Sequence, residues 1–311
     1  MSYIKAFAIA GSVLCIISSV AGCGTYKAAI ISGNSSPGQL VVPKNACSLL
    51  ATPPEPAASY GFSLLAFCDD FDSINTIDVN GTGGAGFKWY TNRPFGSGQT
   101  EPQAYSVSQS VLTVTSTGQT ANWGLSTRDP VTGNGESWRF GYFEARISFD
   151  PEPPPQSIGW PSFWGISASK IQNPGISQYA ELDFFEAGNN PGIPDNWVQG
   201  TLHDWQSDMS VNYWNSNSYQ QTHTDWSQWH IVGVLWAPGI VTWYLDGNPL
   251  MNQQYWSARQ PSPLAVTVNG ISPTPPGTFS DLDLDALGQQ IVVGSDPNWP
   301  MHIDWVRVWH N

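Results

Sequence analysis

Three carboxylates alternate with large apolar side chains in residues 181–186, which read Glu-Leu-Asp-Phe-Phe-Glu. Successive side chains of a strand point to opposite faces, so Glu181 and Asp183 share one face while Glu186 points the other way. One β-bulge after Asp183 would add a residue to the strand and bring all three acids onto one face. Glycosidic bonds are hydrolysed by a pair of such carboxyl groups, so this segment is our candidate catalytic strand.

The spacing of the two glutamates permits this chemistry. With the bulge, their backbones lie about four strand steps, or roughly 13 Å, apart at ~3.3 Å per step, and long side chains leaning inward would close most of the gap. The like charge of Asp183 would raise the pKa of a neighbour and help to keep one glutamate protonated. The alternative is a half-buried strand whose acidic face is only solvated, and these six residues do not decide between the two.

The segments that would hold this strand are also predicted to be strands. Beyond the first sixty residues, short runs of β-branched and aromatic residues alternate with Gly, Pro, Asn and Asp, which is typical of an all-β sandwich or barrel. Alternation over residues 143–149 predicts a strand with one buried face. Nearly continuous apolar runs at 231–236 and 240–245 predict strands covered on both faces, and Asp246-Gly247 predicts a turn.

The N-terminus predicts export. Lys5 precedes an apolar run, residues 6–20, that is too short to cross a bilayer comfortably, and Ala-Gly-Cys follows it. Residues 1–22 are therefore predicted to be a signal peptide. Cys23 lies where a bacterial lipobox places its lipidated cysteine, with simple cleavage as the alternative. We expect an exported protein, secreted or lipid-anchored at the outer surface, that reaches a membrane only through this anchor.

The rest of the chain is predicted to be a tether and one domain. Residues 23–60 are rich in Gly, Ser, Ala and Pro without sustained periodicity, and indicate a flexible tether. Residues 61–311 are then a single catalytic domain, expected to be a monomer. Two of the four cysteines belong to the signal region, which leaves Cys47 and Cys68 as a predicted disulfide in an exported protein.

The composition narrows the range of partners. Charged residues make up 11% of the chain against a usual ~25%, and 11 Lys and Arg in a chain of net charge −13 leave no basic stripe for phosphates. Nucleic acid is therefore excluded as a partner, sulfated polymers are disfavoured, and a neutral polysaccharide fits. The 16 Trp favour stacking on sugar rings, with burial in the core as the alternative. Trp160 and Trp164, just before the acidic strand, are best placed to line such a site.

Several segments, in order along most of the mature domain, resemble glycoside hydrolase family 16, and residues 181–186 resemble the bulged E-x-D-x-x-E motif of its laminarinase- and lichenase-like members. The other similar segments are residues 67–72, 141–146, 160–164, 200–203, 243–247 and 303–309. Two features depart from the family pattern. Ala180 stands where Gly is common, and Phe184-Phe185 replaces the usual aliphatic residues, which leaves the substrate undecided.

The resemblance implies a β-jelly-roll sandwich of two antiparallel sheets with a concave substrate cleft. It also implies a retaining mechanism, in which Glu181 is the nucleophile, Glu186 the acid/base and Asp183 a supporting group. An exported endo-acting β-glucanase, cleaving β-1,3 or mixed β-1,3/1,4 linkages, is the function that follows.

Four further roles come from the same resemblance. Trp160 and Trp164 would stack on sugars, and His203 would reach the cleft as a hydrogen-bond donor, against a purely structural histidine as the alternative. Some members bind a structural Ca²⁺ through an aspartate of the final strand, here Asp304. No cofactor is required for the reaction.

Three other functions remain open from the sequence. A non-catalytic polysaccharide-binding protein on the same scaffold would be expected to have lost a catalytic glutamate, and this chain keeps both. A transglycosylase would use the same residues, although the plant transglycosylases of the family carry a shorter E-x-D-x-E motif. A structural surface lipoprotein would carry the three acids only by coincidence.

Overall fold

The computed structural model describes residues 47, 52–95, 98–115, 124–151, 161–187, 197–206, 211–254, 285–295 and 299–311. The chain divides into two units, Met1–Leu40 and Val41–Asn311, and every described residue belongs to the second. The predicted signal peptide, Cys23 and Trp160 lie outside the described residues. In the part of the chain that is described, no helix is long and apolar enough to cross a membrane.

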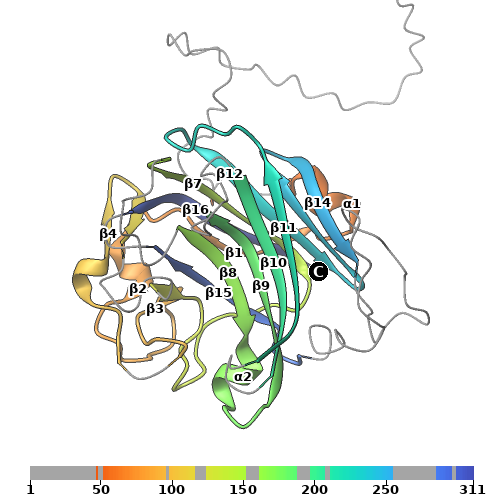
Figure 1. Cartoon of the computed structure of the whole chain (residues 1–311). Helices are drawn as coiled ribbons and strands as arrows, with labels where there is room; N and C mark the ends of the chain where they lie inside the picture. Colours follow the sequence, from red (N-terminus) through yellow and green to blue (C-terminus); the bar gives the residue numbers. More distant parts are fainter. Residues whose placement is uncertain are drawn as a thin grey trace, which may run out of the picture. The chain divides into compact units, whose positions relative to one another are not determined.

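Two eight-stranded sheets form the described fold and pack face to face (Figure 1). Sheet A has the order β14-β13-β12-β7-β16-β5-β4, with β1 also paired to β16. Its strands are β1 (Leu64–Asp69), β4 (Tyr105–Ser108), β5 (Val111–Val114), β7 (Gly141–Phe149), β12 (His230–Ala237), β13 (Ile240–Leu245), β14 (Asn248–Gln254) and β16 (Met301–His310).

Sheet B has the order β11-β10-β9-β8-β15-β6-β3-β2. Its strands are β2 (Ile77–Asp78), β3 (Trp89–Tyr90), β6 (Leu125–Ser126), β8 (Ser162–Ser167), β9 (Gln178–Ala187), β10 (Trp197–Gln206), β11 (Val211–Gln221) and β15 (Gln289–Gly294). Among the described strands, only β2 and β3 pair in parallel. The predicted all-β sandwich of two antiparallel sheets is confirmed, with that short pair as its exception.

Helices are short and lie at the margins of the sandwich. They are α1 (Glu55–Ser59), α2 (Ala168–Gln172) and the 3₁₀ turns η1 (Ile74–Thr76) and η2 (Pro102–Ala104). The second residue of α1 is Pro56, whose fixed φ suits the first turn of a helix. Ala57 is fully buried against the outer face of sheet A. The folded domain therefore begins inside the segment that was predicted to be a tether, ahead of residue 61.

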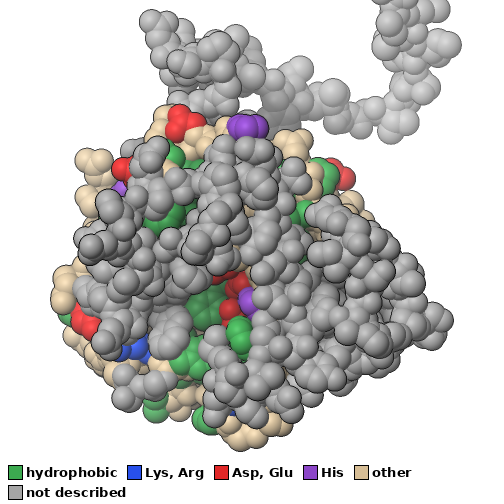
Figure 2. All heavy atoms as spheres, in the orientation of Figure 1, with side chains coloured by type: hydrophobic (Ala, Val, Ile, Leu, Met, Phe, Trp, Pro, Cys, Tyr) green, Lys and Arg blue, Asp and Glu red, His purple; other side chains and the backbone are tan. Residues whose placement is uncertain are grey.

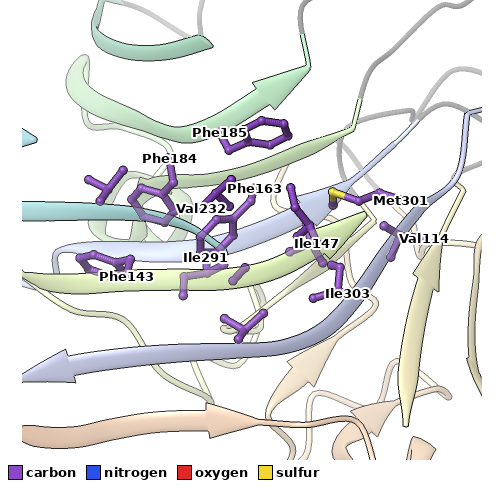
Figure 3. Packing of buried hydrophobic residues seen from close by; sticks show 14 of the residues in the cluster. Val114, Phe143, Ile147, Phe163, Phe184, Phe185, Val232, Ile291, Met301 and Ile303 are labelled. Atoms are coloured by element: carbon purple, nitrogen blue, oxygen red, sulfur yellow. The ribbon is translucent and has the colours of Figure 1, made fainter. Parts of the chain in front are cut away.

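A continuous aromatic and aliphatic core fills the space between the sheets (Figure 3). Phe184 of β9 stacks on Phe143 of β7 at 4.8 Å between ring centroids and meets Phe163 of β8 edge-on at the same distance. Phe149 packs on Phe185 from the opposite sheet at 5.9 Å. The catalytic candidate strand is thus held against sheet A by its own phenylalanines.

Strand β7 confirms the predicted core face but not the predicted open face. Its residues 143, 145, 147 and 149 all belong to the core, as their alternation indicated. The other face is buried as well, because Tyr142 packs in a second apolar cluster that contains Ala57 of α1. Glu144 is 2% exposed there and pairs with Arg307, whose Nε lies 2.9 Å from its Oε1. The expectation of one exposed face was wrong because α1 covers part of this sheet.

The turn between β13 and β14 has the geometry that Asp246-Gly247 predicted. Both residues have positive φ, 50° and 77°, as a two-residue type I′ hairpin requires. Asp246 also reaches back to β12: it accepts from the backbone N–H of Ile231 at 2.8 Å, and its Oδ2 lies 2.8 Å from Nδ1 of His230. One carboxylate therefore ties the hairpin to the neighbouring strand.

The predicted disulfide is present. Cys47 is bonded to Cys68, and their Cα atoms are 5.5 Å apart. Cys68 lies in β1, which pairs with the final strand β16 along the edge of β16 that it shares with β5. The bond therefore fastens the chain ahead of α1 to sheet A.

Candidate active site

Strand β9 contains the predicted bulge. Its Glu186 pairs with Gln199 of β10 and its Asp183 with Thr201, so three steps on β9 oppose two steps on β10. The same extra residue interrupts the pairing with β8, where Phe163 faces Phe185 and Trp164 faces Asp183. The interruption comes directly after Asp183, as the sequence predicted.

The bulge brings the three acids onto the outer face of sheet B. Leu182, Phe184 and Phe185 lie in the core, and Glu181, Asp183 and Glu186 alternate with them on the other face. The acids are nevertheless 8%, 2% and 9% exposed, because neighbouring side chains surround them. Figure 2 shows acidic and histidine side chains together in a hollow over the middle of this face, where β9 and β10 run.

The backbone of the bulge is fixed from the opposite sheet. The indole Nε1 of Trp243, in β13, donates a hydrogen bond of 2.8 Å to the backbone carbonyl of Asp183. This indole reaches β9 past Gly200 of β10, where a Cβ atom would lie only 2.1 Å from Nε1. Glycine is needed at this position because the space that a side chain would fill holds the donor that satisfies the bulge.

Alternate residues of β10 supply a hydrogen-bond partner to each of the three acids. Gln199 Nε2 donates to Oε2 of Glu186 at 3.1 Å, and Nε2 of His203 lies 3.1 Å from Oδ2 of Asp183. A third bond, to Glu181, comes from the indole Nε1 of Trp205, which donates to Oε2 at 2.7 Å. The Trp205 ring also stacks on the His203 ring, with centroids 4.8 Å apart and planes 16° from parallel.

Burial and crowding set the protonation of the acids. Burial raises the pKa of Glu181 well above its usual value, and the charge of Asp183 adds to the rise. His203 and the hydrogen bond from Trp205 act in the opposite direction. Burial also raises the pKa of Asp183, to about 7, although hydrogen bonds with Glu181 and Thr201 offset part of that effect. Both carboxyl groups are therefore harder to ionise than ordinary acids.

The two predicted sugar-stacking residues, Trp160 and Trp164, have different outcomes. Trp160 lies outside the described residues. Trp164 is on the predicted face, directly opposite Asp183, but it is 2% exposed and packs with Ile166 and Tyr179. Trp164 therefore supports the floor of the site in this structure, and its stacking on a sugar stays a prediction.

The surroundings of Asp304 do not fit the predicted Ca²⁺ site. Its Oδ2 lies 2.5 Å from Nη1 of Arg146, whose guanidinium also lies over the ring of Trp229. Among the described residues, Asp304 belongs to no group of three or more His, Cys, Asp or Glu side chains that could hold a metal ion. The guanidinium of Arg146 already pairs with the carboxylate that Ca²⁺ would need, so we assign no metal to Asp304.

Within the described part of the chain, one group of three ligand atoms does converge, on Glu181, Asp183 and His203, within 4.8 Å. The hydrogen bond between His203 and Asp183 accounts for this closeness, and we assign no metal to it. His203 thus lies beside the acids, as predicted, and its partner in the described structure is Asp183.

Sequence reasoning missed Gln199 and Trp205. A signal was available, since Gln199, Thr201, His203 and Trp205 alternate along the β10 strand and must share a face once His203 is placed beside the acids. The bulge register places Gln199 directly opposite Glu186, and Trp205 reaches Glu181 diagonally, which the sequence of β10 alone does not show.

A family model supports the assignment that the geometry suggests. The model described as "Glycosyl hydrolases family 16" matches residues 96–270, more than half of the chain, and this stretch includes β9 and β10. The chain belongs to glycosyl hydrolase family 16.

Individual relatives of this family 16 chain are distant. It is 27% identical over 191 residues to the clotting factor G alpha subunit of Tachypleus tridentatus, covering 57% of this chain and 24% of that protein. It is 25% identical over 233 residues to the endo-1,3-1,4-beta-glycanase ExsH of Rhizobium meliloti (strain 1021), covering 70% of this chain and 44% of that protein. The chain thus spans less than half the length of these curated relatives.

Among solved structures, the family 16 chain is similar to the laminarinase of Flavobacterium sp. UMI-01. The TM-score is 0.49 at 14% identity, and the match covers 79% of this chain and all of that one.

Proposed function

We propose that this protein is an exported, endo-acting glycoside hydrolase that cleaves a neutral β-linked polysaccharide, a β-1,3-glucan or mixed β-1,3/1,4-glucan, with retention of configuration. The observation that carries the proposal is the bulge of β9. It places two glutamates and an aspartate on one face while their backbone is fixed to β8, β10 and sheet A. A solvated acidic face would need neither the burial of these acids nor a separate partner for each.

The mechanism assigns one task to each acid. Glu186, which Gln199 orients, gives its proton to the glycosidic oxygen as the bond to the leaving sugar breaks. The ionised carboxylate of Glu181 attacks the anomeric carbon and forms a glycosyl-enzyme ester. Glu186 then takes a proton from water, the water attacks the same carbon, and Glu181 leaves as a carboxylate. Asp183, whose Oδ2 lies 3.1 Å from Nε2 of His203, lies between the two glutamates as a supporting group.

The substrate class rests on composition and on relatives. A chain with net charge −13 and 11 Lys and Arg repels anionic polymers in general, which supports a neutral one. The relative ExsH bears the name endo-1,3-1,4-beta-glycanase, which supports these linkages. The Cys47–Cys68 disulfide supports export, because such bonds persist in oxidising compartments.

The test is release of reducing ends from laminarin, lichenan, agarose, carrageenan and xyloglucan. We expect cleavage of laminarin or lichenan by the parent, and a loss of roughly 10²–10⁴-fold in kcat for Glu186→Gln, the range for removal of a general acid/base. Glu181→Gln should lose at least as much, because no covalent intermediate can form. The exposed Glu136→Gln is the matched control and should keep the parent rate.

Other results would count against the proposal in distinct ways. Binding to a polymer without cleavage would indicate a polysaccharide-binding protein. Transfer to added oligosaccharide in preference to water would indicate a transglycosylase. A Glu181→Gln variant as fast as the parent would refute the nucleophile assignment, and inversion of the anomeric configuration, followed by proton NMR of the product, would refute retention.

A further inference from the structure

Gln199, His203 and Trp205, which bond to the acids from β10, differ in what their hydrogen bonds allow. An amide or an imidazole has both donor and acceptor atoms, so Gln199 and His203 can face either protonation state of their acids. The indole of Trp205 has an N–H and no acceptor. At 2.7 Å from Oε2 of Glu181, it can only donate to this oxygen, and such a bond is stronger to a carboxylate than to a neutral carboxyl group.

The Trp205 ring is held so that this donor keeps its direction. It stacks on His203 two residues earlier in β10, and it lies opposite Tyr179 of β9 in the strand register. On the other side of β10, the pairing with β11 shifts between Asp204 and Trp205. Trp205 lies directly opposite Tyr179 of β9, and its stacked ring reaches Glu181, two residues further along β9, from an irregular point of β10.

The charged groups around Glu181 all favour its protonation except one. Asp183 and Glu186 of its own strand carry like charge, and His203 of β10 opposes them. On its other side, β8 presents Ile166, which is fully buried and offers no polar atom. The N–H of Trp205 and the charge of His203 are therefore the contacts that oppose protonation of Glu181.

We propose that Trp205 is a positioning residue whose indole N–H favours the ionised carboxylate of Glu181, so that loss of this N–H makes Glu181 easier to protonate. The proposal rests on the proposed function, because it explains how Glu181 is ready to act as the nucleophile. It assigns to Trp205 a role in the ionisation of the site that is separate from its packing.

The experiment compares the pH dependence of kcat/KM in the parent and in Trp205→Phe. Phenylalanine keeps a ring to stack on His203 but has no N–H. We expect the acidic limb of the profile to move up by about one pH unit, so kcat/KM falls about tenfold below the limb and recovers above it. A purely structural role would instead lower the rate at every pH without moving the limb.

Trp309→Phe is the matched control. Trp309 is also a buried tryptophan, and its Nε1 donates to a buried glutamate, Glu144, at 2.9 Å, but in sheet A. This variant should leave the acidic limb where the parent has it. An unmoved limb in Trp205→Phe, or an equal shift in Trp309→Phe, would overturn the proposal. If Trp205→Phe does not fold, benzothienylalanine at this position keeps the shape of the ring, lacks the N–H and carries the same expectation.

A readout without turnover separates this inference from the proposed function. If the parent cleaves no polymer, the proposed function fails, but the infrared band of protonated carboxyl groups still reports their titration. We expect the midpoint of this band to lie higher in Trp205→Phe than in the parent. Identical midpoints would overturn the role of Trp205 whatever the activity proves to be.

Discussion

At the scale of single residues, Phe184 shows how one extra residue serves both faces of a strand. Its insertion shifts Glu186 onto the face of the other acids, and its own ring enters the core between Phe143 and Phe163. Phe184 is 1% exposed, so the bulge adds aromatic area to the core as well as correcting the acidic face. The more usual aliphatic residues would fill less of this space.

Replacement of Phe184 by alanine should therefore be costly. We expect Phe184→Ala to lower the free energy of unfolding by about 3–5 kcal/mol, the usual range for a buried phenylalanine, because it leaves a cavity between the sheets. Urea unfolding followed by tryptophan fluorescence measures the change. Val131→Ala, at a side chain that is 82% exposed, is the control and should change stability by less than about 0.5 kcal/mol. Equal effects in the two variants would contradict the assigned packing.

The residues of the site could be predicted where their spacing and their chemistry pointed to the same arrangement. The trio Glu181, Asp183 and Glu186, and the bulge between them, could be predicted because period-2 geometry leaves one simple way to align three acids. The burial of Trp164 could not, because it depends on residues distant in sequence, such as Tyr179, that cover the same face. Trp205 was missed for a similar reason, since its bond to Glu181 crosses strands diagonally.

At the scale of elements, the β13–β14 hairpin depends on an ionisable contact with β12. Burial alone would lower the pKa of His230, but its hydrogen bond to Asp246, with the charges of Asp246 and Asp225, outweighs burial and raises the pKa. A histidine whose pKa is raised on folding binds more protons in the folded state. Its contribution to stability is therefore complete below the unfolded pKa, about 6.5, and disappears as pH rises through the folded pKa.

Asp246→Asn tests this contact without disturbing the turn, because asparagine also tolerates positive φ and can accept from the N–H of Ile231. We expect the variant to be less stable than the parent at pH 5.5, and the difference to shrink by pH 9. Urea unfolding at both values measures it. The surface variant Asp72→Asn should show a difference from the parent that does not change with pH in this way. A constant difference for Asp246→Asn would exclude the role of His230.

Element type was more predictable from the sequence than element burial. The alternation of β7 gave its core face correctly, but α1, which the Pro-rich composition concealed, buries the other face. A five-residue helix has too few positions to show a periodic pattern. The Asp246-Gly247 turn was predictable because its conformation depends on the two turn residues themselves.

At the scale of the whole molecule, the Cys47–Cys68 bond closes a loop of 21 residues onto β1. The double variant Cys47→Ala/Cys68→Ala should lose about 3 kcal/mol of stability, the loop-closure value for this length. Thermal unfolding with and without reductant measures the loss, and reductant should have no effect on the variant. Activity at low temperature should be unchanged, because Cys68 lies in sheet A and the acids in sheet B. Lost activity in a folded double variant would contradict this separation.

The contact between Gly200 and Trp243 limits how this scaffold can be redesigned. The outer face of β10 carries Gln199 and Trp205, the partners of the acids, and its inner face at residue 200 must stay empty for the indole that donates to the carbonyl of Asp183. A side chain at residue 200 would displace the Trp243 indole, and such variants would lose this hydrogen bond between the two sheets. Redesigned variants of sheet B should therefore keep both Gly200 and Trp243.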